Sequence, residues 1–285
     1  MILVTGATGS VGGAVVRGLL EQKVGPVRAA YRDAKDGSTL PPEAQAVRAD
    51  FADPPSLDRA LAGVKAAYLV CAAVPQLVEL ETNFLTACKK AGTAHVVIQS
   101  ALGAADFGKS FPSWHRQVEE TARVLQVPAT VLRPNGFMQN IGTYFAAGIR
   151  SQDCLFDGLG DARISYIDVR DVAAAAVTAL TTRTTVGGVY ELHGPEALGN
   201  DELARSISRV AGRPIKNVDL TLEQMKQGMI AAGMPEERAR PVVELYEYYR
   251  AGGGVGSAGV LRSLIGREPR TIDAYLGEIA PMFAK

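Results

Sequence analysis

The sequence predicts an α/β fold in which a doubly wound parallel sheet is followed by a smaller, mainly helical C-terminal lobe. In the first half of the 285-residue chain, short apolar runs alternate with amphipathic segments of helical length. Two of these runs, 69–72 and 96–98, are apolar on both faces, as expected for strands that helices cover on each side. The last third reads mainly as helices.

Six strands are predicted in the first half, with an amphipathic helix after most of them. The predicted strands are 2–6, 27–32, 45–49, 66–72, 94–100 and 128–133. The predicted helices lie near 12–22, 56–62, 78–91 and 114–126. This alternation indicates parallel pairing, which brings the carboxyl ends of the strands to one edge of the sheet.

The alternation loosens after Pro134. Strands are expected at 163–168 and 189–193, and helices at 170–181, 199–211, 221–232 and 236–250. The glycine run at 252–257 is predicted to be a flexible break, either a surface loop or a pocket lid. We predict one domain over 1–150, to which 163–193 returns, and a smaller substrate-binding lobe over 194–285.

Charge and hydropathy exclude several classes of protein. Lys+Arg and Asp+Glu both number 30, so no basic surface is expected for nucleic acid. No uncharged apolar run reaches the roughly 18 residues of a membrane span. We expect no basic leader before the first strand, and the three cysteines form no paired motif. We therefore expect a cytoplasmic protein, either a monomer or a homodimer. The three histidines lack ligand spacing, so no metal site is expected.

The stretch GATGSVGG, residues 6–13, places glycines where a predicted strand passes into a helix. Gly6 lets the chain turn sharply, Gly9 lets backbone N–H groups approach a pyrophosphate, and Gly12 lets the helix pack closely on the strand. The helix N-terminus presents unpaired N–H groups and a partial positive charge to an anion. Tight turns without a ligand also use glycines. The interpretation as a phosphate-binding loop therefore depends on the position of the stretch between a predicted strand and a predicted helix. We predict an NAD(P)-binding domain of the Rossmann type.

The tip of the second strand bears on which dinucleotide binds. NAD would favour an acidic residue there, but the strand ends in Arg32, with Lys35 nearby. A guanidinium can hold a 2′-phosphate through two parallel hydrogen bonds, so NADPH is the predicted cofactor, with NADH possible but weaker. Asp33 follows directly and could serve a ribose hydroxyl instead, and a solvated Arg-Asp turn is the remaining alternative.

The chain resembles the NmrA-like group of atypical short-chain dehydrogenase/reductases, which includes quinone and triphenylmethane-dye reductases. The matching segments, which cover nearly the whole chain, are VTGATGSVGGAVV (4–16), YRD (31–33), RADFADPPSLDRALAGV (48–64), NFLTACKKAGTAHVVIQSA (83–101), HRQVEE (115–120), TVLRPNGFMQN (130–140), ISYIDVRDVAAAAV (164–177) and LIGREPRTIDAYL (264–276). These segments are more specific for the family than for a substrate.

The resemblance implies binding residues at the carboxyl ends of the strands. Together with the residues singled out above, the predicted cofactor-binding residues are Gly6, Thr8, Gly9, Ser10, Val11, Gly12, Arg32, Asp50, Phe51, Cys71, Ala72, Ala73, Ser100, Asn135, Gly136 and Phe137. Of these, 8–11 would line the pyrophosphate, 50–51 the adenine, 71–73 the riboses and 100 and 135–137 the nicotinamide. The predicted substrate residues are Ala101, Trp114, Met138 and Asn140.

The proton donor of typical short-chain dehydrogenases is missing. None of the nine tyrosines has a lysine four residues later, so the Tyr-x-x-x-Lys pair is absent. His115 occupies the place where the resemblance implies a catalytic-type lysine or histidine. It could orient the substrate or relay a proton, with Glu119 one helical turn away holding its ring. A partly exposed structural histidine is the alternative, and Trp114 could equally wall the pocket or pack on the core.

Two functions follow from these observations. The first is an NADPH-dependent reductase that transfers hydride to an electrophilic, apolar or aromatic small molecule, such as a quinone, a dye, an imine or an activated enone. Such acceptors take hydride readily and can obtain a proton from water. The alternative, also found in the family, is a non-catalytic protein that senses NADP(H) and regulates a partner. The retained RPNGFMQN segment and His115 favour the reductase.

Overall fold

The computed structural model describes the backbone of residues 1–285 and all side chains except those of residues 34 and 35. The predicted contribution of Lys35 therefore lies outside the described residues. The chain divides into two compact units, and each is described by itself. Unit 1 comprises Met1–Ala105, Pro112–Arg133 and Val169–Glu191, and unit 2 comprises Asp106–Phe111, Pro134–Asp168 and Leu192–Lys285. The domain boundaries expected from the sequence stay a prediction.

Unit 1 is built on a seven-stranded sheet with the order β3-β2-β1-β4-β5-β6-β9. Its strands are β1 (Ile2–Val4), β2 (Val27–Tyr31), β3 (Gln45–Arg48), β4 (Ala66–Leu69), β5 (His95–Gln99), β6 (Ala129–Pro134) and β9 (Val189–Leu192). The pairs from β3 through β6 are parallel, and Val4 is aligned with Ala29 of β2 and Tyr68 of β4. The predicted fold class is confirmed. Because β1 is flanked by β2 and β4, the loop after β1 lies in the middle of the carboxyl edge.

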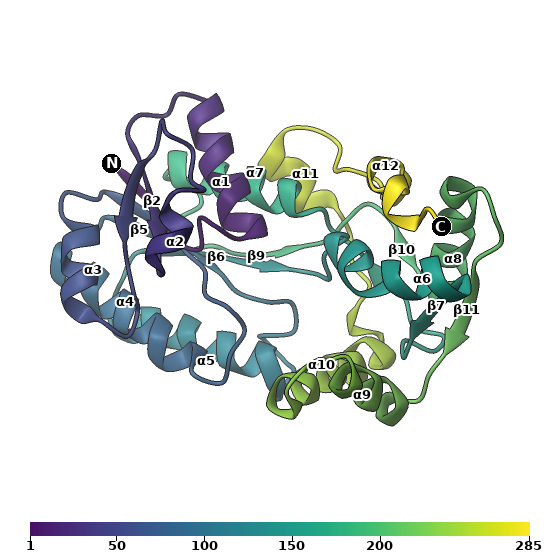
Figure 1. Ribbon diagram of the computed structural model, residues 1–285. Coiled ribbons are helices and arrows are strands. Elements are labelled where there is room, and N and C mark those ends of the chain that lie inside the picture. Colours follow the sequence, from purple (N-terminus) through teal and green to yellow (C-terminus); the bar gives the residue numbers. More distant parts are fainter. The chain divides into compact units, whose positions relative to one another are not determined.

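Helices cover both faces of this sheet. They are α1 (Ser10–Glu21), α2 (Ala34–Gly37), α3 (Pro54–Leu61), α4 (Leu77–Ala91), α5 (Ser110–Val124) and α7 (Val169–Thr181). Figure 1 shows α1 and α7 on one face and α3, α4 and α5 on the other. The two helices α1 and α7 pack so closely that a Cβ on Gly18 would lie 3.1 Å from Val177 Cγ2.

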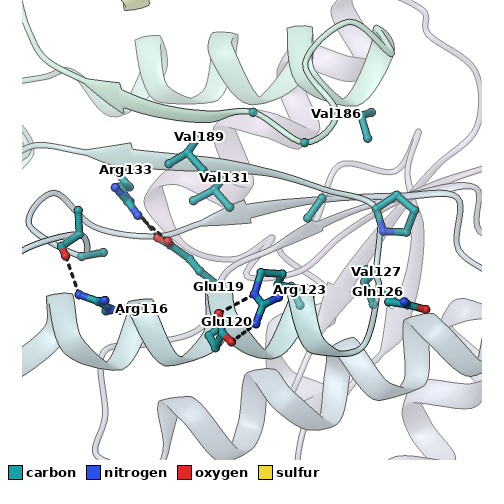
Figure 2. A pocket seen from close by; sticks show the side chains of 17 residues that line it. Arg116, Glu119, Glu120, Arg123, Gln126, Val127, Val131, Arg133, Val186 and Val189 are labelled. Atoms are coloured by element: carbon teal, nitrogen blue, oxygen red, sulfur yellow. Dashed lines mark hydrogen bonds and ion pairs between the residues drawn. The ribbon is translucent and has the colours of Figure 1, made fainter.

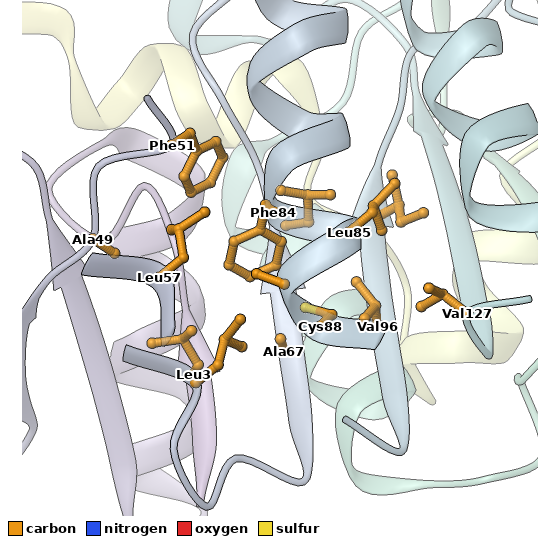
Figure 3. Packing of buried hydrophobic residues seen from close by; sticks show 14 of the residues in the cluster. Leu3, Ala49, Phe51, Leu57, Ala67, Phe84, Leu85, Cys88, Val96 and Val127 are labelled. Atoms are coloured by element: carbon orange, nitrogen blue, oxygen red, sulfur yellow. The ribbon is translucent and has the colours of Figure 1, made fainter. Parts of the chain in front are cut away.

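The core of unit 1 fills the space between the sheet and α4 (Figure 3). Leu3, Ala67 and Val96, from three adjacent strands, are fully buried with Phe84 and Leu85 of the helix. Burying one such leucine or phenylalanine stabilises a fold by about 1.5–3 kcal/mol. The double burial that the apolar runs predict therefore follows from helices on both faces.

Unit 2 is mainly helical, as predicted for the C-terminal region, and contains two small two-stranded sheets. β7 (Cys154–Asp157) pairs with β11 (Lys216–Asp219) in parallel, and β8 (Ile164–Ser165) pairs with β10 (Ala197–Leu198) antiparallel. The helices are η1 (Ile141–Phe145), α6 (Ala146–Gln152), α8 (Asn200–Ala211), α9 (Leu222–Ala231), α10 (Glu236–Tyr248), η2 (Tyr249–Gly253), α11 (Gly259–Ile265), α12 (Ile272–Glu278) and η3 (Ala280–Phe283). Within the described residues, no helix is long and apolar enough to cross a membrane.

The glycine run at 252–257 is not the flexible break that the sequence predicts. The carbonyl of Gly254 accepts hydrogen bonds from the backbone N–H of Ser165 at 2.9 Å and from Asn135 Nδ2 at 2.8 Å. A Cβ on Gly256 would lie 2.3 Å from the His193 ring. These glycines allow close approach to neighbouring segments, which single-sequence patterns do not distinguish from flexibility.

Candidate functional site

The loop after β1 requires glycine at two positions for different reasons. Gly6 has φ +57°, and a Cβ there would lie 2.6 Å from Val70 Cγ1. A Cβ on Gly12 would lie 2.2 Å from the carbonyl oxygen of Gly6. Both distances are far inside van der Waals contact, so a side chain at either position would displace the loop. The loop is thus held tightly against the start of α1, as the predicted phosphate-binding turn needs.

The N-terminus of α1 fits an anion. Its N-cap is Gly9, which makes no side-chain capping bond, and its first turn has no acidic residue. Thr8, Gly9 and Ser10 are exposed residues, whereas Val11 and Gly12 are buried. The Gly9 N–H donates to the Gly6 carbonyl at 2.9 Å, and the first N–H groups of this 12-residue helix lie at its positive end, the arrangement that binds a pyrophosphate. The residues present therefore fit a dinucleotide, and their assignment to it stays a prediction.

Thr5 anchors this loop and was not identified from the sequence. Its buried hydroxyl lies 3.0 Å from the Tyr68 carbonyl and 3.1 Å from that of Val70, and it accepts the Val70 N–H at 2.9 Å. These bonds join the carboxyl ends of β1 and β4. The only available signal was a polar residue closing an otherwise apolar strand.

Arg32 follows β2 directly and extends into solvent. Its side chain is 72% exposed, and its Nη2 lies 3.0 Å from a carboxylate oxygen of Asp33. This pair raises the pKa of Arg32, so the guanidinium stays charged. An exposed ion pair of this kind contributes little to stability, about 0–1 kcal/mol. Arg32 is therefore free to exchange Asp33 for a phosphate, and Asp33 is equally placed to meet a ribose hydroxyl.

The two residues predicted to contact the adenine, Asp50 and Phe51, make different contacts within the protein. The Asp50 carboxylate accepts the N–H of Ala52 at 3.0 Å and pairs with Arg48 at 3.3 Å. The Phe51 ring packs on Phe84 with 5.0 Å between ring centroids and belongs to the core cluster (Figure 3). The Phe51 side chain is thus committed to packing, and its backbone carbonyl accepts a hydrogen bond from Asn83 Nδ2 at 3.0 Å.

The carboxyl end of β4 offers exposed backbone for the cofactor. Ala72 and Ala73 are exposed, and Cys71 is half-buried. Burial raises the pKa of the Cys71 thiol to about 11, with a smaller effect from Glu81. The thiol is therefore neutral at physiological pH, and Cys71 is suited to packing against a ribose rather than to nucleophilic chemistry.

Beyond β5, the predicted cofactor residue Ser100 is joined to a partly buried ion pair. Its hydroxyl donates to Glu119 Oε1 at 2.5 Å. Arg133 holds the same carboxylate with two hydrogen bonds, from Nε at 3.0 Å and from Nη2 at 2.6 Å (Figure 2). The predicted substrate residue Ala101 follows Ser100 and is half-buried.

The expected support of His115 by Glu119 is not formed. The Glu119 carboxylate is turned to Ser100 and Arg133, and His115 Nδ1 is buried without a hydrogen-bond partner among the described residues. Burial lowers the pKa of His115 to about 4, and the charge of Glu119 offsets only part of that effect. His115 is therefore neutral at physiological pH. Its neighbour Trp114 packs against the core of unit 1.

The predicted residues of unit 2 are mostly engaged within that unit. Asn135 Nδ2 contacts His193 Nδ1 at 3.1 Å and donates to the Gly254 carbonyl, while Oδ1 accepts the Gly136 N–H at 2.7 Å. Met138 is 1% exposed in the hydrophobic core of unit 2, which corrects its expected position facing a substrate. Phe137 and Gly136 are half-buried, and Asn140 is exposed.

Two cavities lie away from the glycine loop. A groove of about 1040 Å³ runs along α5 and β6 in unit 1, and its walls include Arg116, Glu119, Arg123 and Val189 (Figure 2). A polar cavity of about 450 Å³ in unit 2 is lined mainly by charged and amide side chains. No group of three or more His, Cys, Asp or Glu side chains in the described part of the chain is arranged to hold a metal ion.

Comparison with known proteins agrees with this geometry. The model of the NmrA-like family matches residues 1–276. The NAD(P)H azoreductase of Xenophilus azovorans is 36% identical over 285 residues, which cover 99% of each chain. A (4-alkanoyl-5-oxo-2,5-dihydrofuran-3-yl)methyl phosphate reductase of Streptomyces griseus is 34% identical over 286 residues, covering 100% of this chain and 99% of that protein. The NADPH-dependent quinone oxidoreductase of Escherichia coli, solved with NADPH, shares the fold with a TM-score of 0.91 at 24% identity, covering 98% of this chain and 99% of that one. The chain belongs to the NmrA-like family.

Proposed function

We propose that this protein is an NADPH-dependent reductase that transfers hydride to an electrophilic small organic acceptor, such as a quinone, a dye, an imine or an activated enone. As a member of the NmrA-like family related to NAD(P)H azoreductase, it is an NAD(P)H-dependent oxidoreductase. The preference for NADPH and the class of acceptor go beyond that statement. The observation that carries the proposal is the glycine cradle of Gly6 and Gly12 at the N-terminus of α1.

The order of the strands supports one direction for the dinucleotide. The loop after β1 takes the pyrophosphate, and β2 and β4 lie on opposite sides of β1. Arg32 follows β2, so the adenosine end with its 2′-phosphate extends toward β2. The other end then extends toward β4 and β5, beside Cys71 and Ser100. The nicotinamide group supplies the hydride, and the chain orients it and excludes water.

The protonation states on this edge favour acceptors that need no strong acid. His115 is neutral because its pKa lies at about 4, and the single proton of Ser100 is donated to Glu119. The chain also lacks a Tyr-x-x-x-Lys pair. A positioned general acid accelerates a reaction by about 10²–10⁴-fold, which matters for an ordinary ketone. Quinones, cationic dyes and iminium ions accept hydride without that help.

The acceptors named for two relatives are consistent with this chemistry. The azoreductase acts on a conjugated N=N bond, and the furan-derived phosphate has a C=C bond conjugated to a carbonyl group. Both bonds are electrophilic. For this chain, the binding roles of Asn135, Gly136 and Phe137 toward the nicotinamide remain part of the proposal. The same holds for the acceptor residues Ala101, Trp114 and Asn140, as well as for a turnover role of His115.

The test is the loss of NADPH absorbance with purified protein and a panel of quinones, cationic dyes, imines and activated enones. Oxidation of NADPH that is faster than oxidation of NADH with the same acceptor supports the proposal. In Arg32→Ala the preference for NADPH should shrink by about 10-fold or more, because a charged hydrogen bond is worth about 1.5–3 kcal/mol. An unchanged preference would remove Arg32 from the 2′-phosphate site. Tight NADPH binding without turnover of any acceptor would instead favour the alternative of a non-catalytic NADP(H) sensor.

A further inference from the structure

A largely buried group of three polar side chains lies where β5 and β6 end, with Ser100 buried and Glu119 and Arg133 partly exposed. Ser100 directly follows β5, Glu119 lies on α5, and Arg133 lies near the end of β6. Ser100 is 2% exposed, and the side chains of Glu119 and Arg133 are each 13% exposed. Figure 2 shows the Glu119–Arg133 pair from the side of the groove. We refer to these three residues as the clamp.

The hydrogen bonds of the clamp join three elements at one carboxylate. Glu119 Oε1 accepts from both Ser100 Oγ and Arg133 Nε, and Oε2 accepts from Arg133 Nη2. Arg133 Nη1 also lies 3.6 Å from Glu191 of β9. A two-point contact between a guanidinium and a carboxylate has a defined geometry as well as charge. These bonds therefore restrict rotation of the Glu119 carboxyl group. The fixed carboxylate in turn orients the Ser100 hydroxyl.

We propose that Glu119 is a positioning residue for hydride transfer, which acts by fixing the carboxyl end of β5 against α5 and β6. This inference rests on the proposed function, in which the nicotinamide end of the dinucleotide extends toward β4 and β5. Ser100 and the half-buried Ala101 directly follow the end of β5 on that side. The clamp fixes the position of these two residues relative to the nicotinamide. The loop proposed to bind the pyrophosphate follows β1, which lies two strands away from β5, and this loop is not part of the clamp.

Stability alone is a weak reason for such an arrangement. Removing two charges from water costs free energy that their attraction only partly offsets, and well-packed apolar residues often replace a buried ion pair without loss. Geometry gives the stronger reason, because a displacement of about 1 Å in a reacting group can lower the rate about 100-fold. A clamp that holds a strand end in place therefore affects the rate of hydride transfer more than the affinity for the dinucleotide.

The experiment compares Glu119→Gln and Ser100→Ala with the wild-type enzyme and with two control variants. Glu120→Gln is the matched control, because Glu120 is the next residue on α5 and pairs with Arg123 in solvent. Ser100→Thr keeps the hydroxyl donor and should restore the clamp. We expect kcat to fall about 10- to 100-fold in Glu119→Gln and Ser100→Ala, with NADPH affinity within about 3-fold of wild type. We also expect a larger primary deuterium isotope effect in both, since hydride transfer becomes limiting. Glu120→Gln should stay close to wild type, and Ser100→Thr should keep more of kcat than Ser100→Ala does.

A second readout requires no turnover. The fluorescence of bound NADPH comes from its nicotinamide ring, so its intensity should change in Glu119→Gln and Ser100→Ala but not in Glu120→Gln. If wild type binds NADPH and reduces no acceptor, the proposed function fails, and this fluorescence change still supports the positioning role. The inference is overturned if the variants lose thermal stability while kcat, isotope effect and fluorescence stay as in wild type. Equal loss of kcat in Glu120→Gln would overturn it as well.

Discussion

Glu81 lies on α4 in the core of unit 1 with 0% of its surface exposed. Neither of its carboxyl oxygens has a hydrogen-bond partner among the residues that the structure describes. Burial raises the pKa of Glu81 to about 8, and the nearby backbone N–H of Cys71 offsets only part of that rise. The folded protein therefore holds Glu81 as a neutral acid at physiological pH, which avoids an unpaired buried charge.

This proton makes stability depend on pH. The unfolded chain releases it near the ordinary pKa of 4.5, whereas the folded chain keeps it up to about pH 8. Within this window unfolding releases a proton, so the free energy of unfolding falls as pH rises, by at most about 1.4 kcal/mol per pH unit. We predict that the stability advantage of Glu81→Gln over wild type grows with pH through this window and levels off above it.

Urea unfolding at several pH values within the window measures this difference. Glu79→Gln is the matched control, because Glu79 lies on the same helix and is exposed. Parallel stability curves for wild type and Glu81→Gln would show that Glu81 does not keep its proton in the folded state.

At the residue scale, the sequence predicted which positions lie at the carboxyl edge better than it predicted their partners. The spacing of His115 and Glu119 correctly placed both on one helix, but it indicated a contact that the structure replaces with Arg133. Arg133 comes from a strand that follows α5, and helical periodicity contains no information about a partner on another element. Likewise, Phe51 and Met138 are apolar, and only the fold shows that both pack in a core.

At the element scale, the first helix and its loop act as one unit. Gly12 lies in the first turn of α1, where any side chain would meet the Gly6 carbonyl. We predict that Gly12→Ala greatly weakens NADPH binding, because the displaced loop no longer aims its N–H groups at the pyrophosphate. Equilibrium titration of NADPH fluorescence measures the effect.

Gly228→Ala is the control for this variant, since Gly228 lies within α9 and has open space where a Cβ would be. It should bind NADPH like wild type. If Gly12→Ala is folded by circular dichroism and also binds NADPH like wild type, the loop is a turn without a role in cofactor binding.

Elements with strong periodicity were predicted well from the sequence. All six strands expected in the first half form, and the helix expected at 78–91 is observed as α4, Leu77–Ala91. The pair β7 and β11 was missed, because each strand has only four residues and β11 has a single apolar one, so neither shows a strand pattern. The run 252–257 was misread because close packing and flexibility both favour glycine.

At the scale of the whole molecule, the sequence and structure support one chemistry. The charge balance gives no basic footprint, the fold is that of the NmrA-like family, and the carboxyl edge of unit 1 fits a dinucleotide. His115, the residue predicted to relay a proton, is neutral, and the hydroxyl proton of Ser100 is donated to Glu119. The account therefore predicts direct hydride transfer to a carbon or heteroatom that is already electrophilic.

The measurement that tests this claim most directly is deuterium transfer from NADPH that carries deuterium at both hydrogen positions of nicotinamide C4. The acceptor should be the cationic dye or activated enone that the protein reduces fastest, because a deuterium bound to carbon does not exchange with water. The account predicts a product heavier by one deuterium, detected by mass spectrometry, with label lost from the cofactor. An unlabelled product, or labelled NADPH recovered intact with every acceptor, would contradict it.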